Sequence, residues 1–177
     1  MGKLGSNYPQ TILAGNRLAD PIFHQMCEGA GGGVSLILAA DAAMHVLSDI
    51  HHSVLPSITN IAYVVPTVLA LFCVARLGLV QRAHNQAAIS DLESFPAAAD
   101  IQDVKNRSTA QRHLSHVTLS SIIFGASAAF FSLALFRGAS IAMLLPSGFA
   151  GAGSLYWGER NYDLLFDRLN RFRVPFV

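Results

Sequence analysis

The sequence predicts an all-α, polytopic membrane protein with four transmembrane helices, a helical connector and an amphipathic C-terminal helix. Of its 177 residues, 52% are hydrophobic and only 13% are charged, about half the charged share of an average soluble domain. So few charges cannot cover the surface of a water-soluble domain of this size. A lipid bilayer is therefore the expected environment of the chain.

The composition also argues against several other classes of protein. Lys and Arg (12) nearly balance Asp and Glu (11), which is not typical of a nucleic-acid-binding module. Cys27 and Cys73 are too few for a disulfide framework or a thiolate metal site. The sequence holds no phosphate-binding loop, no dinucleotide fingerprint and no nucleophile–base spacing. We therefore expect a protein that is not an enzyme.

Three segments without a charged residue predict membrane-spanning helices: residues 58–75, 117–136 and 138–158. Roughly 20 apolar residues in a helix cross a hydrocarbon core of about 30 Å. Pro66 and Pro146 lie inside two of these segments, and membrane helices tolerate proline where neighbouring groups satisfy the freed carbonyl.

Residues 29–48 form a fourth candidate span, apolar apart from Asp41 and His45. A carboxylate near the centre of a span costs about 2.5–3.5 kcal/mol on insertion scales, so the segment either crosses the membrane or forms a buried or interfacial helix. Four spans place every Lys and Arg except Arg137 on one side, together with both termini. The positive-inside rule makes that side the matrix face of the mitochondrial inner membrane or, alternatively, the cytoplasmic face of a bacterial inner membrane.

The predicted spans divide the chain into five parts. They are a polar N-terminal segment (1–28), a first transmembrane pair (29–80), an extramembrane helical connector (81–116), a Gly/Ala/Ser-rich transmembrane hairpin (117–158) and an amphipathic tail (159–177).

The two ends of the chain and the connector carry weaker signals. The first segment has no apolar run typical of a cleavable signal. Gly2 and Ser6 match the loose pattern for N-myristoylation; the alternative is that they belong to a flexible terminus. Pro96 splits the connector into two polar helices. In the tail, Leu165, Leu169 and Phe172 have helical spacing, which predicts a helix that lies along the headgroups or packs on the connector.

Small residues recur along the predicted hairpin and favour close helix packing. Ser121, Gly125 and Ala129 repeat every fourth residue, and similar ladders run through residues 147–158. Membrane helices associate where small residues let their backbones approach, either within the hairpin, in self-association or with a partner helix. The expected packing positions are Gly125, Ala129, Gly148, Gly151, Gly153 and Gly158.

Four ionisable residues share one face of the first predicted span: Asp41, His45, Asp49 and His52, spaced 4, 4 and 3 apart. Such groups normally face the protein interior or water. One interpretation is a structural network in which Asp41 pairs with His45 or with another subunit. The alternatives are a divalent metal site, His45 as an axial haem ligand, and a proton relay or quinone contact.

Two further expectations concern ligands. His113 and His116 form a second pair, three residues apart, that is typical of a solvent-facing surface. We expect bound lipid and no cofactor, with haem at His45 as the alternative.

Residues 117–163 resemble the short Gly-rich hairpin subunit of the mitochondrial cristae-organising system (MICOS). The shared features are Arg137 in the turn, the glycines Gly148, Gly151 and Gly153, the aromatic pair that follows them and then charged residues. The resemblance implies an integral inner-membrane protein that oligomerises, bends the membrane and associates with ATP synthase. It covers about a quarter of the chain. The chain departs from the family in its first hairpin helix, where Gly125 stands among Ala and Ser instead of in a glycine series, and in its preceding 116 residues.

These observations lead to one expected function and two alternatives. We expect a non-enzymatic accessory or architectural subunit of an energy-converting membrane complex, an ATP synthase or respiratory assembly, with membrane subunits and the bilayer as its partners and no nucleic acid. The alternatives are a haem- or quinone-binding anchor that uses His45, and a small pore or transporter that uses Asp41 and His45.

Overall fold

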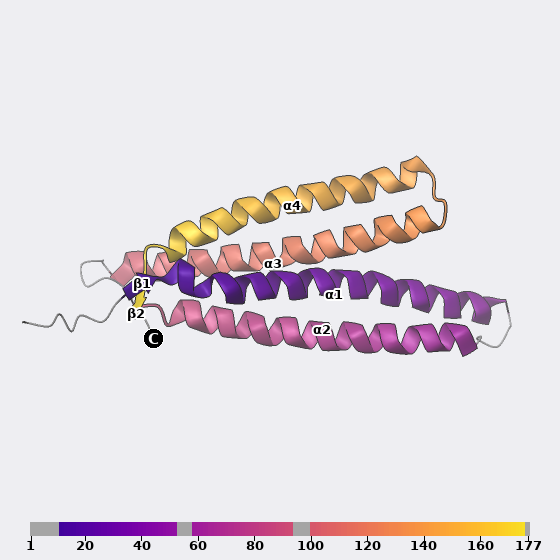
Figure 1. Ribbon diagram of the computed structural model, residues 1–177, viewed down its shortest axis with the longest axis horizontal. Helices are drawn as coiled ribbons and strands as arrows, with labels where there is room; N and C mark the ends of the chain where they lie inside the picture. Colours follow the sequence, from indigo (N-terminus) through magenta and orange to yellow (C-terminus); the bar gives the residue numbers. More distant parts are fainter. Residues whose placement is uncertain (1–10, 53–57, 94–99, 176–177) are drawn as a thin grey trace, which may run out of the picture.

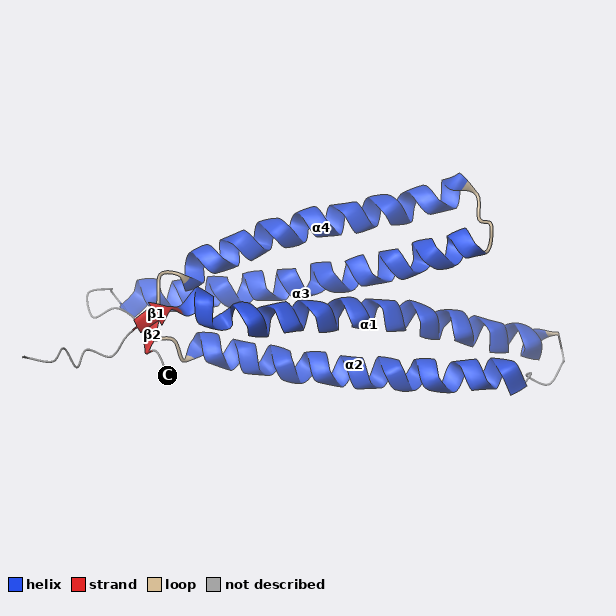
Figure 2. Ribbon diagram, viewed as in Figure 1, coloured by secondary structure: helices blue, strands red, loops and turns tan. Residues whose placement is uncertain are grey.

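The computed structural model describes residues 11–52, 58–93 and 100–175, which form four long helices and two short strands. The elements are β1 (Thr11–Leu13), α1 (Ala14–His51), α2 (Ile58–Ser90), α3 (Asp100–Phe136), α4 (Ile141–Leu169) and β2 (Arg173–Pro175). The helices run side by side in the order α2, α1, α3, α4, so that α1 and α3 occupy the middle (Figure 1). The sheet, the last residues of α2 and the first residues of α3 lie at one end, called the strand end below. The last residues of α1, the first residues of α2 and the α3–α4 turn lie at the other, the turn end (Figure 2).

Three of the helices, α1, α2 and α3 from Ile101 onward, are long and apolar enough to cross a membrane. The protein is thus all-helical apart from a two-stranded ladder, and its composition suits a membrane-embedded chain. Residues 29–48, for which the sequence predicts either a span or a buried or interfacial helix, are part of α1. The helix α4 is also long, but Gly, Ser and Pro dilute the apolar character of residues 141–158. A fourth crossing therefore stays a prediction.

The long helices exceed the thickness of a bilayer. At 1.5 Å per residue, α1 with 38 residues is about 57 Å long and α2 with 33 residues about 50 Å, against a hydrocarbon core of about 30 Å. Both are therefore longer than the hydrocarbon core of a membrane. The helix α2 continues past residue 80 and α3 begins before residue 116, without a break at either expected boundary. Likewise, α1 includes residues 14–28, which the sequence analysis set apart as a polar segment.

The protein's main hydrophobic core lies at the strand end. Its buried residues come from every helix and from the tail: Ala14, Leu18, Ile22, Ile89, Leu92, Ala110, Leu114, Leu165, Leu169, Phe172 and Val174. The three apolar tail residues that predicted an amphipathic helix are thus buried against the ends of α1, α2 and α3. Residues 159–169 continue α4 instead of forming a separate helix.

The two strands connect opposite ends of the described chain. In the antiparallel ladder Ile12 pairs with Val174, and the amide of Ala14 donates to the carbonyl oxygen of Phe172 over 3.0 Å. An all-α prediction does not include this ladder, because three-residue strands carry too little alternation to be recognised.

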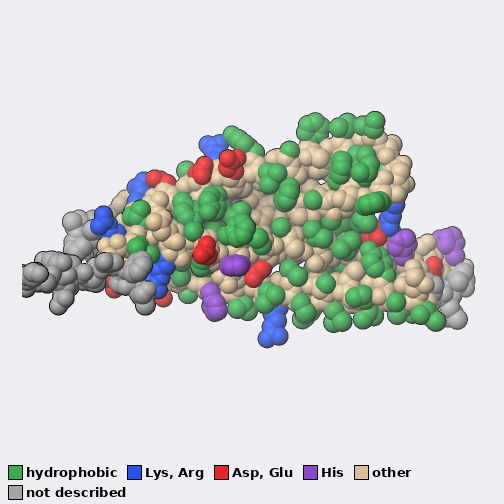
Figure 3. Space-filling view, viewed as in Figure 1, with side chains coloured by type: hydrophobic (Ala, Val, Ile, Leu, Met, Phe, Trp, Pro, Cys, Tyr) green, Lys and Arg blue, Asp and Glu red, His purple; other side chains and the backbone are tan. Residues whose placement is uncertain are grey.

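Elsewhere the surface is largely apolar. Figure 3 shows hydrophobic side chains spread over the helices of the visible face toward the turn end, while charged groups gather mainly toward the strand end. In α2, none of the residues of the most apolar stretch is buried inside the protein.

Candidate functional site: polar contacts and glycines between the helices

The closest approach of two helices is between α1 and α3, at glycines on both. A Cβ atom added to Gly33 would lie 2.1 Å from the carbonyl oxygen of Ile122, and one added to Gly125 would lie 2.0 Å from that of Ala30. No side chain larger than the hydrogen atom of glycine fits at these distances. Small residues provide the close backbone contact on which helix association in lipid depends.

The packing of α4 on α3 uses other small residues. A Cβ added to Gly158 would lie 2.6 Å from Ser120 Oγ, and one added to Gly151 would lie 3.5 Å from Ser127 Cβ. Gly148 approaches only Phe131, at 4.0 Å, and a Cβ at Gly153 would meet nothing within 4 Å.

The structure therefore assigns the expected packing residues to different surfaces. The nearest neighbour of Gly125 is on α1, Gly151 and Gly158 face α3, and Gly153 faces outward. Ala129 is nearly buried, at 9% exposure. Gly29 and Gly33 of α1, which pack against α3, were not among the predicted packing residues, although their four-residue spacing is the usual signal of a close helix contact.

A buried amide network joins α1, α2 and α3. Gln25 Nε2 donates to Thr118 Oγ1 over 2.6 Å, and Asn85 Nδ2 donates to Gln25 Oε1 over 2.6 Å and to the carbonyl oxygen of Pro21 over 3.1 Å. Gln25 and Asn85 are only 1% and 2% exposed. Buried amides need such partners, so this network fixes the relative positions of three helices. The sequence analysis missed it, because neither amide belongs to a motif.

The acidic residue of the first span pairs with the turn between α3 and α4. Arg137 Nη1 lies 2.7 Å from Asp41 Oδ1, and Nη2 donates to Asp41 Oδ2 over 2.8 Å and to His45 Nε2 over 2.9 Å. Gly138, with a φ of 68°, ends α3, and its left-handed backbone favours glycine. Because the helix ends there, Arg137 lies at the level of Asp41 on the neighbouring helix.

The other members of the predicted polar face have separate contacts. Asp49 Oδ2 accepts a 2.6 Å hydrogen bond from Asn60 of α2, and the His52 ring lies edge-on to His51, with 5.5 Å between centroids. The four residues thus do not converge on one centre. In the described part of the chain, no group of three or more His, Cys, Asp or Glu residues is placed to hold a metal ion.

The contact with Arg137 also bears on a ligand at His45. Since Nε2 accepts from the guanidinium, the ring in this arrangement carries its proton on Nδ1. A haem iron at Nε2 would have to displace Arg137.

The second histidine pair faces α4. Nδ1 of His113 and Nδ1 of His116 lie 2.9 and 3.1 Å from Asn161 Oδ1, while Asn161 Nδ2 donates to the carbonyl oxygen of Trp157 over 2.8 Å. An amide oxygen only accepts, so both rings donate. The pair therefore holds α3 to α4 instead of facing solvent.

Comparison with known proteins gives no relative: no family model, curated protein or solved structure matches this chain.

Proposed function

We propose that this protein is a non-enzymatic accessory or architectural subunit of a larger energy-converting membrane complex, and that it resides in the mitochondrial inner membrane. Its partners would be other membrane subunits of an ATP synthase or respiratory assembly. The inner polar contacts support this role, because Gln25, Asn161 and Arg137 each join helices to one another.

The observation that carries the proposal is the outer face of α4. Pro146, Ala150 and Gly153 are exposed on this face, and Gly153 has open space where a side chain would stand. The exposed side chains of Phe149 and Tyr156 flank these small residues. A shallow face of small residues lets a second helix approach closely and gain van der Waals contact. It is the type of surface that a partner helix covers.

The outline of the bundle supports a membrane-shaping role for the same subunit. The helices fan out from the strand end toward the turn end (Figure 1). At the wide end a cavity of about 480 Å³ opens beside Asp41 and Arg137, between α1 and the α3–α4 turn. A body that is wider in one leaflet than in the other favours a curved bilayer.

The experiment is extraction in mild detergent, followed by native sizing and identification of co-migrating proteins. We expect the chain to migrate with other membrane subunits and Gly153→Leu to release it, because leucine fills the open face. Ala70→Leu is the matched control, since Ala70 is an exposed small residue on α2; it should leave the complex intact. Migration of the unsubstituted chain as a lone monomer would contradict the proposal.

A further inference from the structure

A narrow cavity of about 300 Å³ runs between α1, α2 and α3. Its walls are apolar over most of its length, with Leu36, Leu71, Val74 and Ile122 among the lining residues. A Cβ added to Gly32 would lie 3.8 Å from Val74 Cγ1, so the absence of a larger side chain there helps to keep the space open. The cavity has the lining expected of a slot for a hydrocarbon chain.

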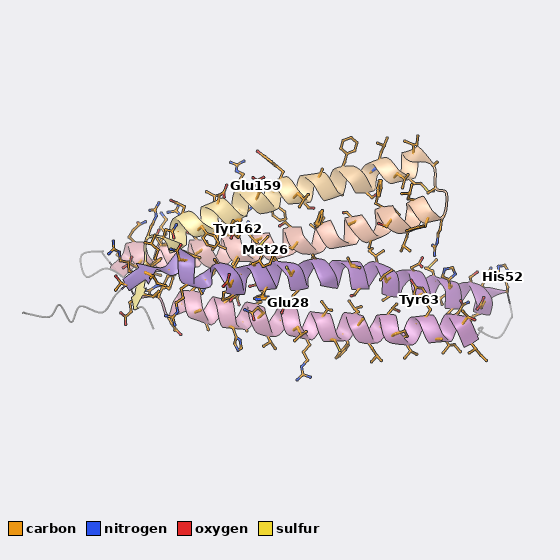
Figure 4. The ribbon with its side chains drawn as sticks, in the orientation of Figure 1. Met26, Glu28, His52, Tyr63, Glu159 and Tyr162 are labelled. Carbon is orange, nitrogen blue, oxygen red and sulfur yellow. The ribbon has the colours of Figure 1, made fainter. Side chains whose placement is uncertain are left out.

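One end of this cavity carries an incompletely satisfied carboxylate. Glu28 lies between α1 and α2 (Figure 4), and its Oε2 atom is buried without a hydrogen-bond partner among the described residues. Gly78 of α2 leaves the room for this side chain, since an added Cβ would lie 3.8 Å from Glu28 Cβ. A buried carboxylate oxygen without a donor is costly, and a ligand that brings an N–H group removes that cost.

A cation lies at the same end. Arg82 lines the cavity with Glu28, and its Nη2 donates to Ser115 Oγ over 3.2 Å. A guanidinium has five N–H donors, so others remain for a ligand. Within the described residues Arg82 and Glu28 form no ion pair with each other. Gln25 and Thr118, the other polar groups at this end, are hydrogen-bonded to one another.

The depth of the two charges suits the membrane interface. Glu28 directly precedes the predicted span 29–48, and Arg82 follows the predicted span 58–75. From Glu28 to Leu36 the α1 axis rises about 12 Å. Charged groups therefore stand at headgroup level, and the apolar part of the cavity reaches into the hydrocarbon region.

We propose that this cavity binds one phosphatidylethanolamine molecule. The primary ammonium donates a hydrogen bond to Glu28 Oε2, the phosphate accepts from Arg82, and one acyl chain occupies the space beside Leu36, Leu71 and Ile122. A choline headgroup has the same charges but no N–H donor, so it leaves Glu28 unsatisfied. The proposal depends on the chain being in a bilayer and does not depend on the subunit role proposed above.

The test is native mass spectrometry of the purified full chain with equal amounts of phosphatidylethanolamine and phosphatidylcholine of the same acyl chains. We expect one retained lipid and a preference for the ethanolamine form of roughly tenfold, as a charge-assisted hydrogen bond gives. The mono- and dimethylated headgroups should be retained well and the trimethylated one poorly, because only the last has no N–H. Equal retention of all four lipids would overturn the proposal without any variant being made.

Variants distinguish the roles that Glu28 and Arg82 have in lipid binding. Glu28→Gln should lower the ethanolamine-to-choline ratio, because the amide oxygen is an uncharged and weaker acceptor. Arg82→Gln should weaken retention of both lipids. Glu159→Gln is the matched control, because that carboxylate lines a different cavity, between α1, α3 and α4; it should keep the ratio. An unchanged ratio in Glu28→Gln, an equal loss in Glu159→Gln, or tighter binding of phosphatidylglycerol than of phosphatidylethanolamine would each overturn the assignment.

Discussion

The strand end and the turn end of the bundle are packed in opposite ways. At the strand end, Leu165 and Phe172 are at most 1% exposed and lie in a hydrophobic core. Toward the turn end, Leu47 is 58% exposed and Phe136 is 90% exposed, while glycines and alanines lie between the helices. The same helices thus hide their large side chains at one end and present them to the surroundings at the other.

This difference is the one expected of a membrane-embedded chain whose two ends meet two solvents, water and lipid. In water, removing apolar surface stabilises a fold, so large side chains gather inside. In lipid that gain vanishes, and helices associate through close backbone contact and hydrogen bonds. Each end of the bundle therefore depends on a different kind of interaction, and substitutions should affect the ends differently.

The largest effect should come from the strand-end core. Phe172→Ala removes a buried ring and should lower the free energy of unfolding by about 3–5 kcal/mol. Phe136→Ala removes the same ring from an exposed position and should change stability little. Thermal unfolding of both variants in detergent micelles measures the contrast. Equal losses would mean that the two ends are packed alike.

The next effect should come from the contact between α1 and α3. Gly125→Ala places a methyl group against the Ala30 carbonyl, so the two helices must separate, at a cost of about 1–3 kcal/mol typical of overpacking. Gly153→Ala, in open space, should be neutral or slightly stabilising because alanine favours the helix. The same unfolding assay compares them; a tolerated Gly125→Ala would rule out the close contact.

A similar or smaller effect should follow from breaking the buried amide network. Asn85→Leu leaves Gln25 Oε1 without its donor and should cost about 1–3 kcal/mol. The double variant Gln25→Leu/Asn85→Leu removes both partners and should lose less than the sum of the two single losses. Unfolding of all three variants forms a double-mutant cycle. Strict additivity would show that the network does not act as a unit.

The smallest effect on stability should come from Asp41→Asn. Arg137 is half exposed in this pair while Asp41 is 12% exposed, and the asparagine amide keeps an oxygen that accepts from Arg137. The substitution should therefore cost about 1 kcal/mol or less and leave expression intact. We expect it to weaken assembly with partner subunits, measured by native sizing. Loss of a spectroscopic or transport signal with assembly unchanged would instead favour a functional role for Asp41 and His45.

Hydropathy was sufficient to predict the apolar parts of α2 and α3, because uncharged runs such as residues 58–75 are a property of the local sequence. Which residues become neighbours in space is not a property of the local sequence. Ser121, Gly125 and Ala129 recur every fourth residue on α3, but periodicity does not tell which helix covers them, and Gly125 contacts α1.

The polar contacts were harder to predict for the same reason. Asp41 was recognised as a residue in need of a partner, yet its partner Arg137 stands 96 positions away in a turn. The amides of Gln25 and Asn85 gave no signal at all, since an isolated Gln or Asn in a helix is usually exposed. Only the folded arrangement of α1, α2 and α3 brings them together.

The pairing of β1 with β2 has a consequence for biogenesis. The ladder joins residues 11–13 to residues 173–175, so the first of these segments leaves the ribosome long before its partner has been synthesised. The helices can form one after another during translation, but the β1–β2 ladder closes only after α4 is complete. The strand-end core behind it is therefore completed last, and a ribosome that stalls within α4 leaves Ala14 and Leu18 uncovered.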